Sequence, residues 1–461
     1  MKAIVDPTGA LAQGLAEIRK QFRVPDAFPP AVLAEAEAAA KRGPTEHVDR
    51  TDRPFVTLDP ASSTDLDQAF TIDRDGQDLL LRYAIADVAW FVDDGGAIDQ
   101  EAWTRGESQY LPDGRAPLYP PVLSEQAASL LPDGPRPAVI FAVRIAPDGT
   151  VKLDGVERAI IRSRAKLAYD HVTAADLPPD FAELGNRIRA ADDRRGASRV
   201  DPPEQEVIQV RPGNFDLTYR PRLASEDRNA ALSLACNLAV ADALQAHHTG
   251  LFRVMAPPDE HAIRRLRFTA RAFGLVWPEA ETLGQFQKNL SAADPREAAF
   301  MLAVRRAGSG ASYAPYQSGV MPWHVAMAAT YTHATAPLRR LGDRYVVRAA
   351  LAIANGQDVP DVVEQAFAKL PPVMARADAL GGNIERAVVD LAEAVMLQGS
   401  EGQVFAAIVT DVDERGARMQ LRDQPVVTRV AAHAVQPGDA ITVRLISTDP
   451  QRRLIQFERV G

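Results

Sequence analysis

The chain has 461 residues, of which 46% are apolar and 25% are charged, and a formal net charge of −9, which is ordinary for a globular protein of about three domains. Its single cysteine, Cys236, excludes an internal disulfide framework and a cysteine-built zinc site. No apolar run approaches the roughly 20 residues of a membrane span, and residues 1–25 lack the apolar segment of a signal peptide, so we expect a cytoplasmic protein without a membrane partner.

The first 48 residues are predicted to form a short helical module. Residues 9–23 carry apolar side chains at helical spacing, and the alanine-rich residues 31–42 indicate a second helix. Two such helices around a turn are typical of a helix-turn-helix module, but the same pattern fits an arm that docks on the next domain. The residues alone leave both interpretations open.

Residues 49–398 are expected to form one large mixed α/β domain, because short β-rich runs are interleaved with helical patterns. The proline- and glycine-rich residues 112–137 are expected to form a structured loop region. The predicted strands are residues 55–58, 79–86 and 139–145, and the predicted helices are residues 229–245, 260–273, 296–306, 340–354 and 375–397.

After a glycine-rich break, residues 399–461 contain strand patterns only. Five short strands in about 60 residues favour a small barrel of the oligonucleotide-binding type. The fold class predicted for the whole chain is therefore α+β, with a helical module in front and a five-stranded barrel behind. The predicted barrel strands are residues 404–412, 417–421, 426–430, 440–447 and 453–457.

A cluster of aspartates directly follows the first predicted strand of the large domain. The segment TLDPASSTDLDQAF, residues 57–70, places Asp59, Asp65 and Asp67 within nine positions. Asp65 and Asp67 face the same side of an extended segment, and a turn through residues 60–64 could return Asp59 beside them. Three such carboxylates repel one another unless a hard cation neutralises them, which favours Mg²⁺ with phosphate oxygens. A solvated acidic loop would show the same pattern.

The acidic segment is also one of several segments that match a known family pattern in order. FVTLDPASSTDLD (55–67) is followed by YAIADVAWFV (83–92), DQEAWTRGESQYLP (99–112) and PLYPPVLS (117–124), and later by YTHATAPLRRLGD (331–343). This series resembles the RNase II / RNB exoribonuclease family, and the predicted barrel resembles its S1 RNA-binding domain. The resemblance covers about residues 50–461.

The resemblance implies a Mg²⁺-dependent exoribonuclease that degrades single-stranded RNA processively from the 3′ end to nucleoside 5′-monophosphates. It places Asp59, Asp65 and Asp67 at the catalytic metal centre, with Asp67 in the most direct role. Gln68 stands where the family usually has a fourth aspartate, and its amide oxygen could ligate Mg²⁺ without adding charge. We expect the chain to act as a monomer.

Four further residues gain a role from the resemblance. Arg339 would contact the scissile phosphate, with Arg340 on the same surface, although an arginine here could instead pair with Asp343. Tyr110 would stack on the 3′-terminal base, a contact that tolerates any base. Asn237 would line the catalytic cavity. Without the resemblance, Tyr110 and Asn237 would be interpreted as ordinary packing residues.

Departures from the family pattern support an alternative function. Besides Gln68, two alanines, Ala230 and Ala231, stand where the family commonly has glutamates. About 50 residues precede the RNB-like block, too few for the two cold-shock barrels typical of bacterial members. The alternative is a catalytically attenuated RNB-like RNA-binding protein, and a further alternative is a nucleic-acid-binding regulator built on the N-terminal helices.

Overall fold

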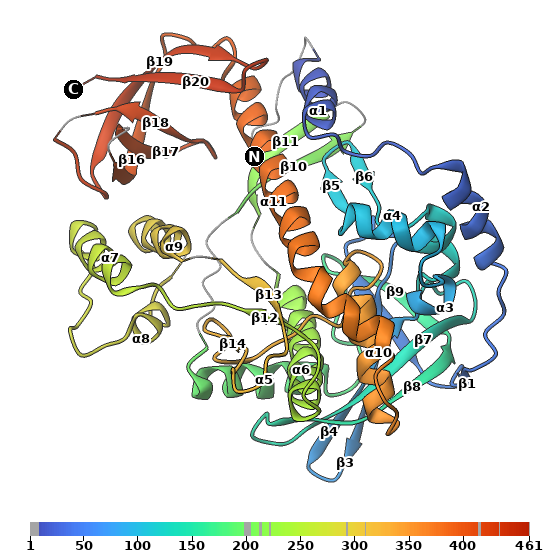
Figure 1. Cartoon of the computed structure of the whole chain (residues 1–461). Helices are drawn as coiled ribbons and strands as arrows, with labels where there is room; N and C mark the ends of the chain where they lie inside the picture. The colour runs from blue at the N-terminus through green and yellow to red at the C-terminus, as the bar shows by residue number, and fades with distance from the viewer. Residues whose placement is uncertain are drawn as a thin grey trace.

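The computed structural model describes residues 9–197, 204–211, 214–220, 223–291, 294–308, 310–413, 416–432 and 434–460. Its centre is a seven-stranded sheet with the order β1-β8-β7-β4-β3-β2-β9 (Figure 1). The inner strands form an antiparallel meander, whereas β1 and β9 pair in parallel at the edges. The strands are β1 (Val48–Asp49), β2 (Phe55–Asp59), β3 (Gln68–Asp75), β4 (Asp78–Ala86), β7 (Arg136–Ile145), β8 (Val151–Ile161) and β9 (Ser163–Ala168).

Two buried helices cover this sheet and complete the main core. Helices α6 (Ala224–Ala246) and α10 (Leu341–Ala354) pack on the strands and on each other, so their apolar residues share one cluster with those of β2, β4 and β7. The three strands and five helices predicted for the large domain are confirmed in type. The remaining helices are α3 (Val88–Phe91), α4 (Ala97–Arg105), α5 (Phe181–Arg195), α7 (Glu260–Ala272), α8 (Leu283–Gln287) and α9 (Pro295–Ala307).

Helix α11 (Asp361–Leu397) is longer than the sequence predicts, because it begins at Asp361 instead of near residue 375. Pro371 and Pro372 lie inside it, and proline ordinarily ends or kinks a helix. Packing along its length outweighs this cost: Val363 and Leu370 are fully buried before the prolines, and Met374 is fully buried after them. The helix passes from α10 past β5 and β10 to the barrel.

Several short strands lie outside the main sheet and were not predicted. They form antiparallel pairs that connect α11 and α6 to the rest of the domain. The region 112–137 is not a plain loop, since it contains β6 and the π-helix η1 (Leu123–Ala127). The pairs are β5 (Gln109–Leu111) with β6 (Gly114–Ala116), β10 (Glu204–Arg211) with β11 (Asn214–Arg220), β12 (Leu251–Val254) with β13 (Ser312–Pro315), and β14 (Trp323–His324) with β15 (Ala329–Thr330).

The N-terminal helices are present but do not pack as a unit. Helix α1 (Ala10–Gln21) buries Leu11, Leu15 and Ile18 in a cluster with α11, whereas α2 (Pro30–Ala39) packs on α4. The two helices bury their apolar faces against different elements of the large domain, as in a docking arm and unlike a helix-turn-helix module, in which the helices pack on each other.

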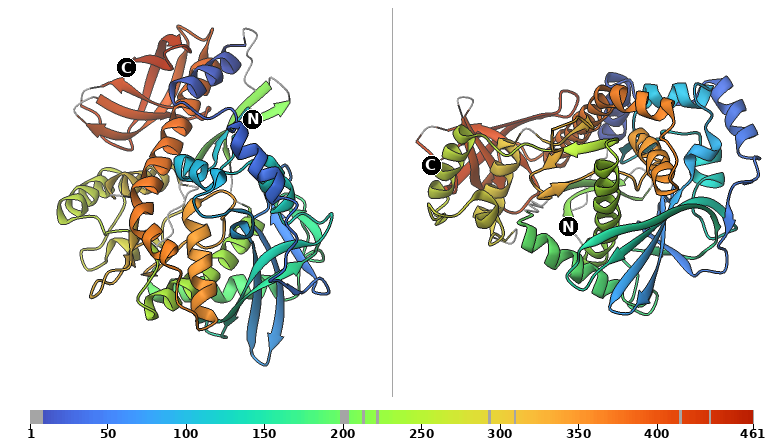
Figure 2. Two further views of the ribbon diagram at one scale, coloured as in Figure 1. Left: turned by 45° about the vertical axis from the view of Figure 1, so that its right-hand side comes forward. Right: turned by 60° about the horizontal axis from the view of Figure 1, so that its bottom comes forward.

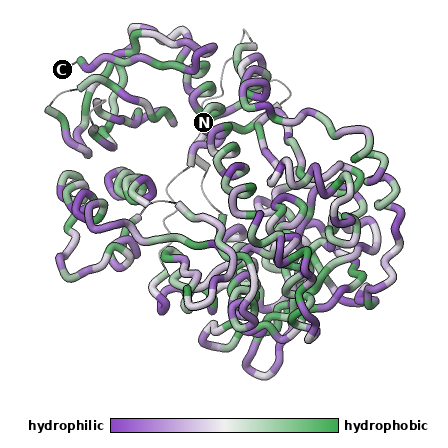
Figure 3. The backbone as a smooth tube through the Cα atoms, in the orientation of Figure 1, coloured by the Kyte–Doolittle hydropathy of each residue, from purple (hydrophilic) through white to green (hydrophobic). Residues whose placement is uncertain are grey.

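The C-terminal strands close into the predicted barrel, with the order β16-β17-β18-β20-β19. The barrel lies at the opposite end of the molecule from the seven-stranded sheet, next to α9 (Figures 1 and 2). Hydrophilic and hydrophobic residues alternate along the helices (Figure 3). No helix in the described ranges is long and apolar enough to cross a membrane. The strands are β16 (Val404–Asp413), β17 (Gly416–Leu421), β18 (Val427–Ala431), β19 (Ala440–Asp449) and β20 (Leu454–Arg459).

The contact between α1 and α11 gives a stability prediction. Leu391 on α11 is fully buried and lies directly against Gly14 of α1. We expect Leu391→Ala to lower the free energy of unfolding by about 2–5 kcal/mol, because it leaves a cavity between two helices that cannot close up completely. Urea unfolding measures this loss, and Val362→Ala, on an exposed part of α11, should change little. Equal effects of the two substitutions would contradict this packing.

A second prediction concerns pH. Burial raises the pKa of Glu393 on α11 to about 8, although Val427 N–H and the Gln205 carboxamide both donate to its Oε1. The folded chain therefore keeps a proton that the unfolded chain releases near pH 4.5, so stability is lost as the pH rises through this interval. We expect Glu393→Gln to raise the thermal midpoint at about pH 8.5 and to change it little at about pH 5. An equal change in the thermal midpoint at both pH values would show that the pKa of Glu393 is not raised.

Candidate active site

The acidic segment leaves β2 and turns back into β3 as a pinned loop. Lys166 Nζ donates to the carbonyl of Ala61 at 2.8 Å, which holds the turn from one side. The Ser129 hydroxyl accepts from the Leu66 N–H at 2.9 Å and donates to the Thr64 carbonyl at 2.7 Å, which holds it from the other. The loop thus returns its last residues toward Asp59, as the sequence predicts for a turn at 60–64.

The three aspartates lie close enough to affect one another electrostatically. Burial raises the pKa of Asp67 to about 8 and that of Asp59 to about 7, and the charge of Asp65 adds to both increases. The guanidinium of Arg339 opposes both increases. Their surroundings therefore disfavour the ionised form of both carboxyls, chiefly through burial.

Asp67 joins the acidic loop to the segment at 331–343. Its Oδ1 accepts the Leu338 N–H at 2.7 Å, and its Oδ2 lies 3.5 Å from Arg339 Nε. Asp67 is only 6% exposed, whereas the Arg339 side chain is 46% exposed. The structure thus brings together two residues that the sequence assigns to one site, with the cation of Arg339 open to a ligand.

Asp65 points elsewhere, contrary to the expectation that it joins the metal ligands. Its Oδ1 accepts from Arg115 Nη1, and its Oδ2 accepts from the Tyr110 hydroxyl at 3.0 Å. Both oxygens of this carboxylate are therefore engaged by protein donors. Arg115 also pairs with Glu125 at 2.8 Å. The sequence analysis missed Arg115 and Glu125; the Asp113–Gly114 pair, a typical hairpin turn signal, could have located the strands that carry Arg115 and Tyr110.

Gln68 also faces away from the aspartates. Its Nε2 donates to the carbonyl of Thr335 at 2.7 Å, and its Oε1 accepts from the Tyr83 hydroxyl at 2.5 Å and from Ser233 at 3.3 Å. The Ser233 hydroxyl also lies 2.7 Å from that of Tyr83, so the two hydroxyls and this oxygen form one hydrogen-bonded group. The expectation that Gln68 ligates a metal ion does not agree with this arrangement, in which the side chain ties β3 to α6 and to the 331–343 segment.

Arg339 and Arg340 have opposite environments. Arg340 Nε and Nη2 donate to the two oxygens of Asp343 at 2.9 and 2.7 Å, and Asp343 is fully buried. Asp343 also accepts the Ala336 N–H at 2.8 Å. Arg340 therefore fixes the start of α10, and its guanidinium is paired with Asp343 while only 17% of its side chain is exposed. Asp343, the alternative partner considered for Arg339, pairs with Arg340 instead. Arg339 therefore remains beside Asp67.

Asn237 on α6 is 2% exposed and lies beneath the 331–343 segment. Its Oδ1 accepts the Ala334 N–H at 2.9 Å, and its Nδ2 donates to the Tyr331 hydroxyl at 3.2 Å. Because protein groups satisfy both ends of the amide, the expectation that Asn237 contacts substrate is not supported. It shapes the backbone that presents Leu338 and Arg339.

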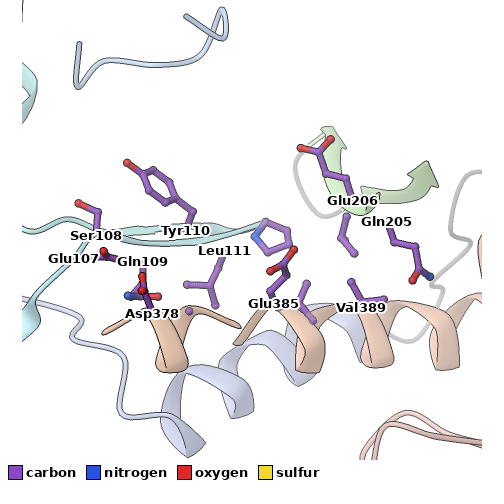
Figure 4. Close-up of a pocket in the computed structure, with 14 residues that line it drawn as sticks. Glu107, Ser108, Gln109, Tyr110, Leu111, Gln205, Glu206, Asp378, Glu385 and Val389 are labelled. Carbon is purple, nitrogen blue, oxygen red and sulfur yellow. The ribbon is translucent and has the colours of Figure 1, made fainter. Parts of the chain in front are cut away.

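Tyr110 lies at the edge of a cavity of about 470 Å³ lined by β5, β10 and α11. The alternation of β5 turns Gln109 and Leu111 toward α11 and the ring of Tyr110 away from it (Figure 4). Tyr110 is 54% exposed, so its ring is available for stacking while its hydroxyl is held by Asp65. The expected accessible aromatic side chain is therefore present beside the acidic loop.

The donor groups fit a magnesium ion in part. Asp59 makes no side-chain hydrogen bond to any described residue, and Asp67 Oδ2 has only its long contact to Arg339. Two carboxylates together with phosphate oxygens of a substrate are a typical Mg²⁺ environment. In the part of the chain that the structure describes, no group of three or more histidine, cysteine, aspartate or glutamate side chains could hold a metal ion. Asp59 and Asp67 are thus the two carboxylates that protein donors leave more open, whereas Arg115 and Tyr110 donate to the two oxygens of Asp65.

Comparisons with known proteins identify the family of the chain. The family model described as RNB domain matches residues 47–355, and the one described as RNase II-type exonuclease C-terminal S1 domain matches residues 403–460. Ribonuclease R of Aquifex aeolicus is 26% identical over 96% of this chain and 70% of its own length. Ribonuclease R of Thermotoga maritima is 28% identical over 89% of this chain, and Exoribonuclease 2 of Cronobacter sakazakii is 29% identical over 84%. The chain spans 62% and 63% of these last two relatives.

Solved structures with the same fold are more distant in sequence. Mycoplasma genitalium RNase R in complex with ribose-methylated single-stranded RNA matches with a TM-score of 0.87 and 20% identity, over 100% of this chain and 79% of that one. Yeast Ssd1, described as a pseudonuclease, matches with a TM-score of 0.68 and 16% identity, over 93% of this chain and 56% of that one. At these identities the likeness supports the fold alone.

The contrast between the two adjacent arginines can be tested by stability. Asp343→Asn leaves the buried guanidinium of Arg340 without a counter-charge, and breaking a buried pair in this way costs about 3–5 kcal/mol. Arg339→Met should change the free energy of unfolding by less than about 0.5 kcal/mol, because Arg339 is half exposed. Urea unfolding of both variants measures the difference. A larger loss of unfolding free energy for Arg339→Met than for Asp343→Asn would show that Arg339, and not Arg340, has the structural role.

Proposed function

Because the chain belongs to the RNB family, we propose that it is a Mg²⁺-dependent exoribonuclease that degrades single-stranded RNA processively from the 3′ end and releases nucleoside 5′-monophosphates. The observation that carries this proposal is the contact of Asp67 with Leu338 and Arg339, since it joins the two family segments around one exposed guanidinium. The names of the relatives, Ribonuclease R and Exoribonuclease 2, support it.

Asp59 and Asp67 are the residues that would hold the cation. A bound Mg²⁺ would supply an activated water at neutral pH and neutralise charge on the phosphate. Arg339, 3.5 Å from Asp67 and half exposed, would donate to the non-bridging oxygens of the scissile phosphate as negative charge develops there. The Leu338 N–H fixes the orientation of Asp67, and so keeps the carboxylate and the guanidinium on the same side of the substrate.

Tyr110 would bind the terminal nucleotide by stacking. Base–aromatic stacking contributes about 1–3 kcal/mol and tolerates every base, which suits an enzyme that moves along RNA of any sequence. The exposed ring lies beside the acidic loop, because its hydroxyl is bonded to Asp65. We also propose that the protein works as a monomer in the cytoplasm, where a reducing environment suits its buried Cys236.

A catalytically attenuated RNA-binding protein remains the second candidate. The arrangement of Gln68 favours it, since the family's fourth acidic position holds here a neutral amide bonded to Thr335, Tyr83 and Ser233. Such a protein would keep the Tyr110 and Arg339 contacts to RNA but bind Mg²⁺ weakly. The two candidates therefore differ in hydrolysis and agree in RNA binding.

A 5′-labelled single strand distinguishes the two candidates. With Mg²⁺ we expect stepwise shortening from the 3′ end and release of mononucleotides, and chelation with EDTA should stop it. Removing Arg339 as Arg339→Met should lower kcat by about 10²–10³-fold, as for other donors to a developing anion, and Asp67→Asn by at least as much. Asp94→Asn, which alters an exposed pair with Arg348, is the matched control and should be fully active. Intact RNA with wild-type protein that nevertheless binds the strand would favour the attenuated candidate.

A further inference from the structure

The carboxylate of Asp65 connects the acidic loop to the β5–β6 hairpin through both of its oxygens. Tyr110 of β5 and Arg115 of β6 stand opposite each other in the hairpin register, and each donates to one oxygen of Asp65. Arg115 Nη2 further donates to Thr64 Oγ1 at 2.5 Å and pairs with Glu125 at 2.8 Å. One guanidinium thus contacts the loop, the hairpin and the π-helix η1.

These contacts lie largely out of water. The side chains of Asp65, Arg115 and Glu125 are 12%, 21% and 30% exposed. A single cation lies between two carboxylates, and breaking such a shielded pair leaves a charge without a partner. The carboxylate of Asp65 is therefore held by Arg115. The carboxylate oxygens of Asp59, by contrast, accept no side-chain hydrogen bond from a described residue.

The strand that bears Tyr110 is also attached to the backbone of the proposed catalytic arginine. The Ser108 N–H donates to the carbonyl of Arg339 at 3.0 Å, and the Leu341 N–H donates to the carbonyl of Gly106 at 3.0 Å. At the other end of the hairpin, Arg19 of α1 donates to both oxygens of Asp113 at 3.0 and 2.8 Å. Both ends of the hairpin are thus fixed, and a shift of its middle part would move Tyr110 relative to Arg339.

We propose that Asp65 and Arg115 are positioning residues that hold Tyr110 at a fixed distance from the Asp67–Arg339 pair, and that Asp65 does not bind the cation. This inference rests on the proposed function. Because the hydroxyl of Tyr110 is bonded to Asp65, the long axis of its ring is held beside the acidic loop. The pair consequently determines how far the 3′-terminal nucleotide advances and which phosphodiester bond reaches Arg339.

Cation binding without RNA separates this role from that of a metal ligand. Titration of the full-length protein with MgCl₂ by calorimetry should show a loss of affinity of at least about tenfold for Asp67→Asn and a clearly smaller loss for Asp65→Asn, which removes only a neighbouring charge. Arg115→Met keeps that charge and should not lower the affinity. A comparable loss for Asp65→Asn would overturn the proposal, because it would place Asp65 among the ligands. Thermal unfolding of each variant confirms that it is folded.

RNA binding and product length test the positioning itself. We expect Asp65→Asn and Arg115→Met to weaken binding of a single-stranded oligonucleotide, measured by fluorescence anisotropy without divalent cation, by about 5–10-fold, which is part of the value of one stacked base. In the Mg²⁺ reaction, KM should rise more than kcat falls, and the final product should lengthen. The double variant should be no worse than the more affected single variant, since both residues act through one contact.

Two further variants complete the test. Tyr110→Phe removes only the hydroxyl that Asp65 holds, and should reproduce the change in product length with unaltered Mg²⁺ affinity. Arg348→Met breaks an exposed arginine–aspartate pair elsewhere and should match wild type in every assay. Normal RNA affinity and product length in Asp65→Asn and Arg115→Met would refute the positioning role. Wild-type protein that binds RNA but does not hydrolyse it would refute the proposed function alone, because the anisotropy and calorimetry results still decide the inference.

Discussion

The site depends on one hydrogen bond between distant parts of the chain, from the Leu338 N–H to the buried carboxylate of Asp67, 271 positions apart. A carboxylate inside the protein needs donors, and a backbone N–H at a fixed place in a turn is a donor that cannot rotate away. This bond places Arg339, the next residue, beside Asp67. Asn237 from below and Asp343 from the side hold the same segment, so the buried charge and the exposed cation have a defined relation.

Ion pairing in the vicinity decides which cations remain available. Arg340 is bound to Asp343, Arg115 to Asp65 and Glu125, and Arg253 to Asp378, all at hydrogen-bond distance. Arg339 has only a 3.5 Å contact and is half exposed. In a chain of net charge −9, the attraction of an anionic strand to this site therefore comes from local arrangement and not from overall charge. Because Arg340, Arg115 and Arg253 are paired with carboxylates, Arg339 is the arginine of these four that is open to an anionic ligand.

Much of this architecture could be predicted from the sequence, because apolar runs mark β4 and α6, short β-rich runs mark the barrel, and two dense motifs mark Asp59, Asp67 and Arg339. The failures have a common cause. Asp65 and Gln68 belong to the same motif, yet their directions are set by Arg115, Tyr83 and Ser233, which lie on other elements. Arg339 and Arg340 are identical side chains in adjacent positions, so only the folded backbone determines which of them is buried. Patterns locate a segment, whereas partners far along the chain orient its side chains.

Helix α11 gives the molecule a further property. It contacts α1, α10, β5, β10, β13 and two barrel strands, so one rigid rod spans the distance from the C-terminal barrel to the cavity beside Tyr110. Pro371 and Pro372 remove two amide donors within it, next to the last turns that face α10. Beyond this point the helix is uninterrupted by proline as far as the barrel. A displacement of the barrel would therefore move the cavity wall with it, and bending would concentrate at the proline pair.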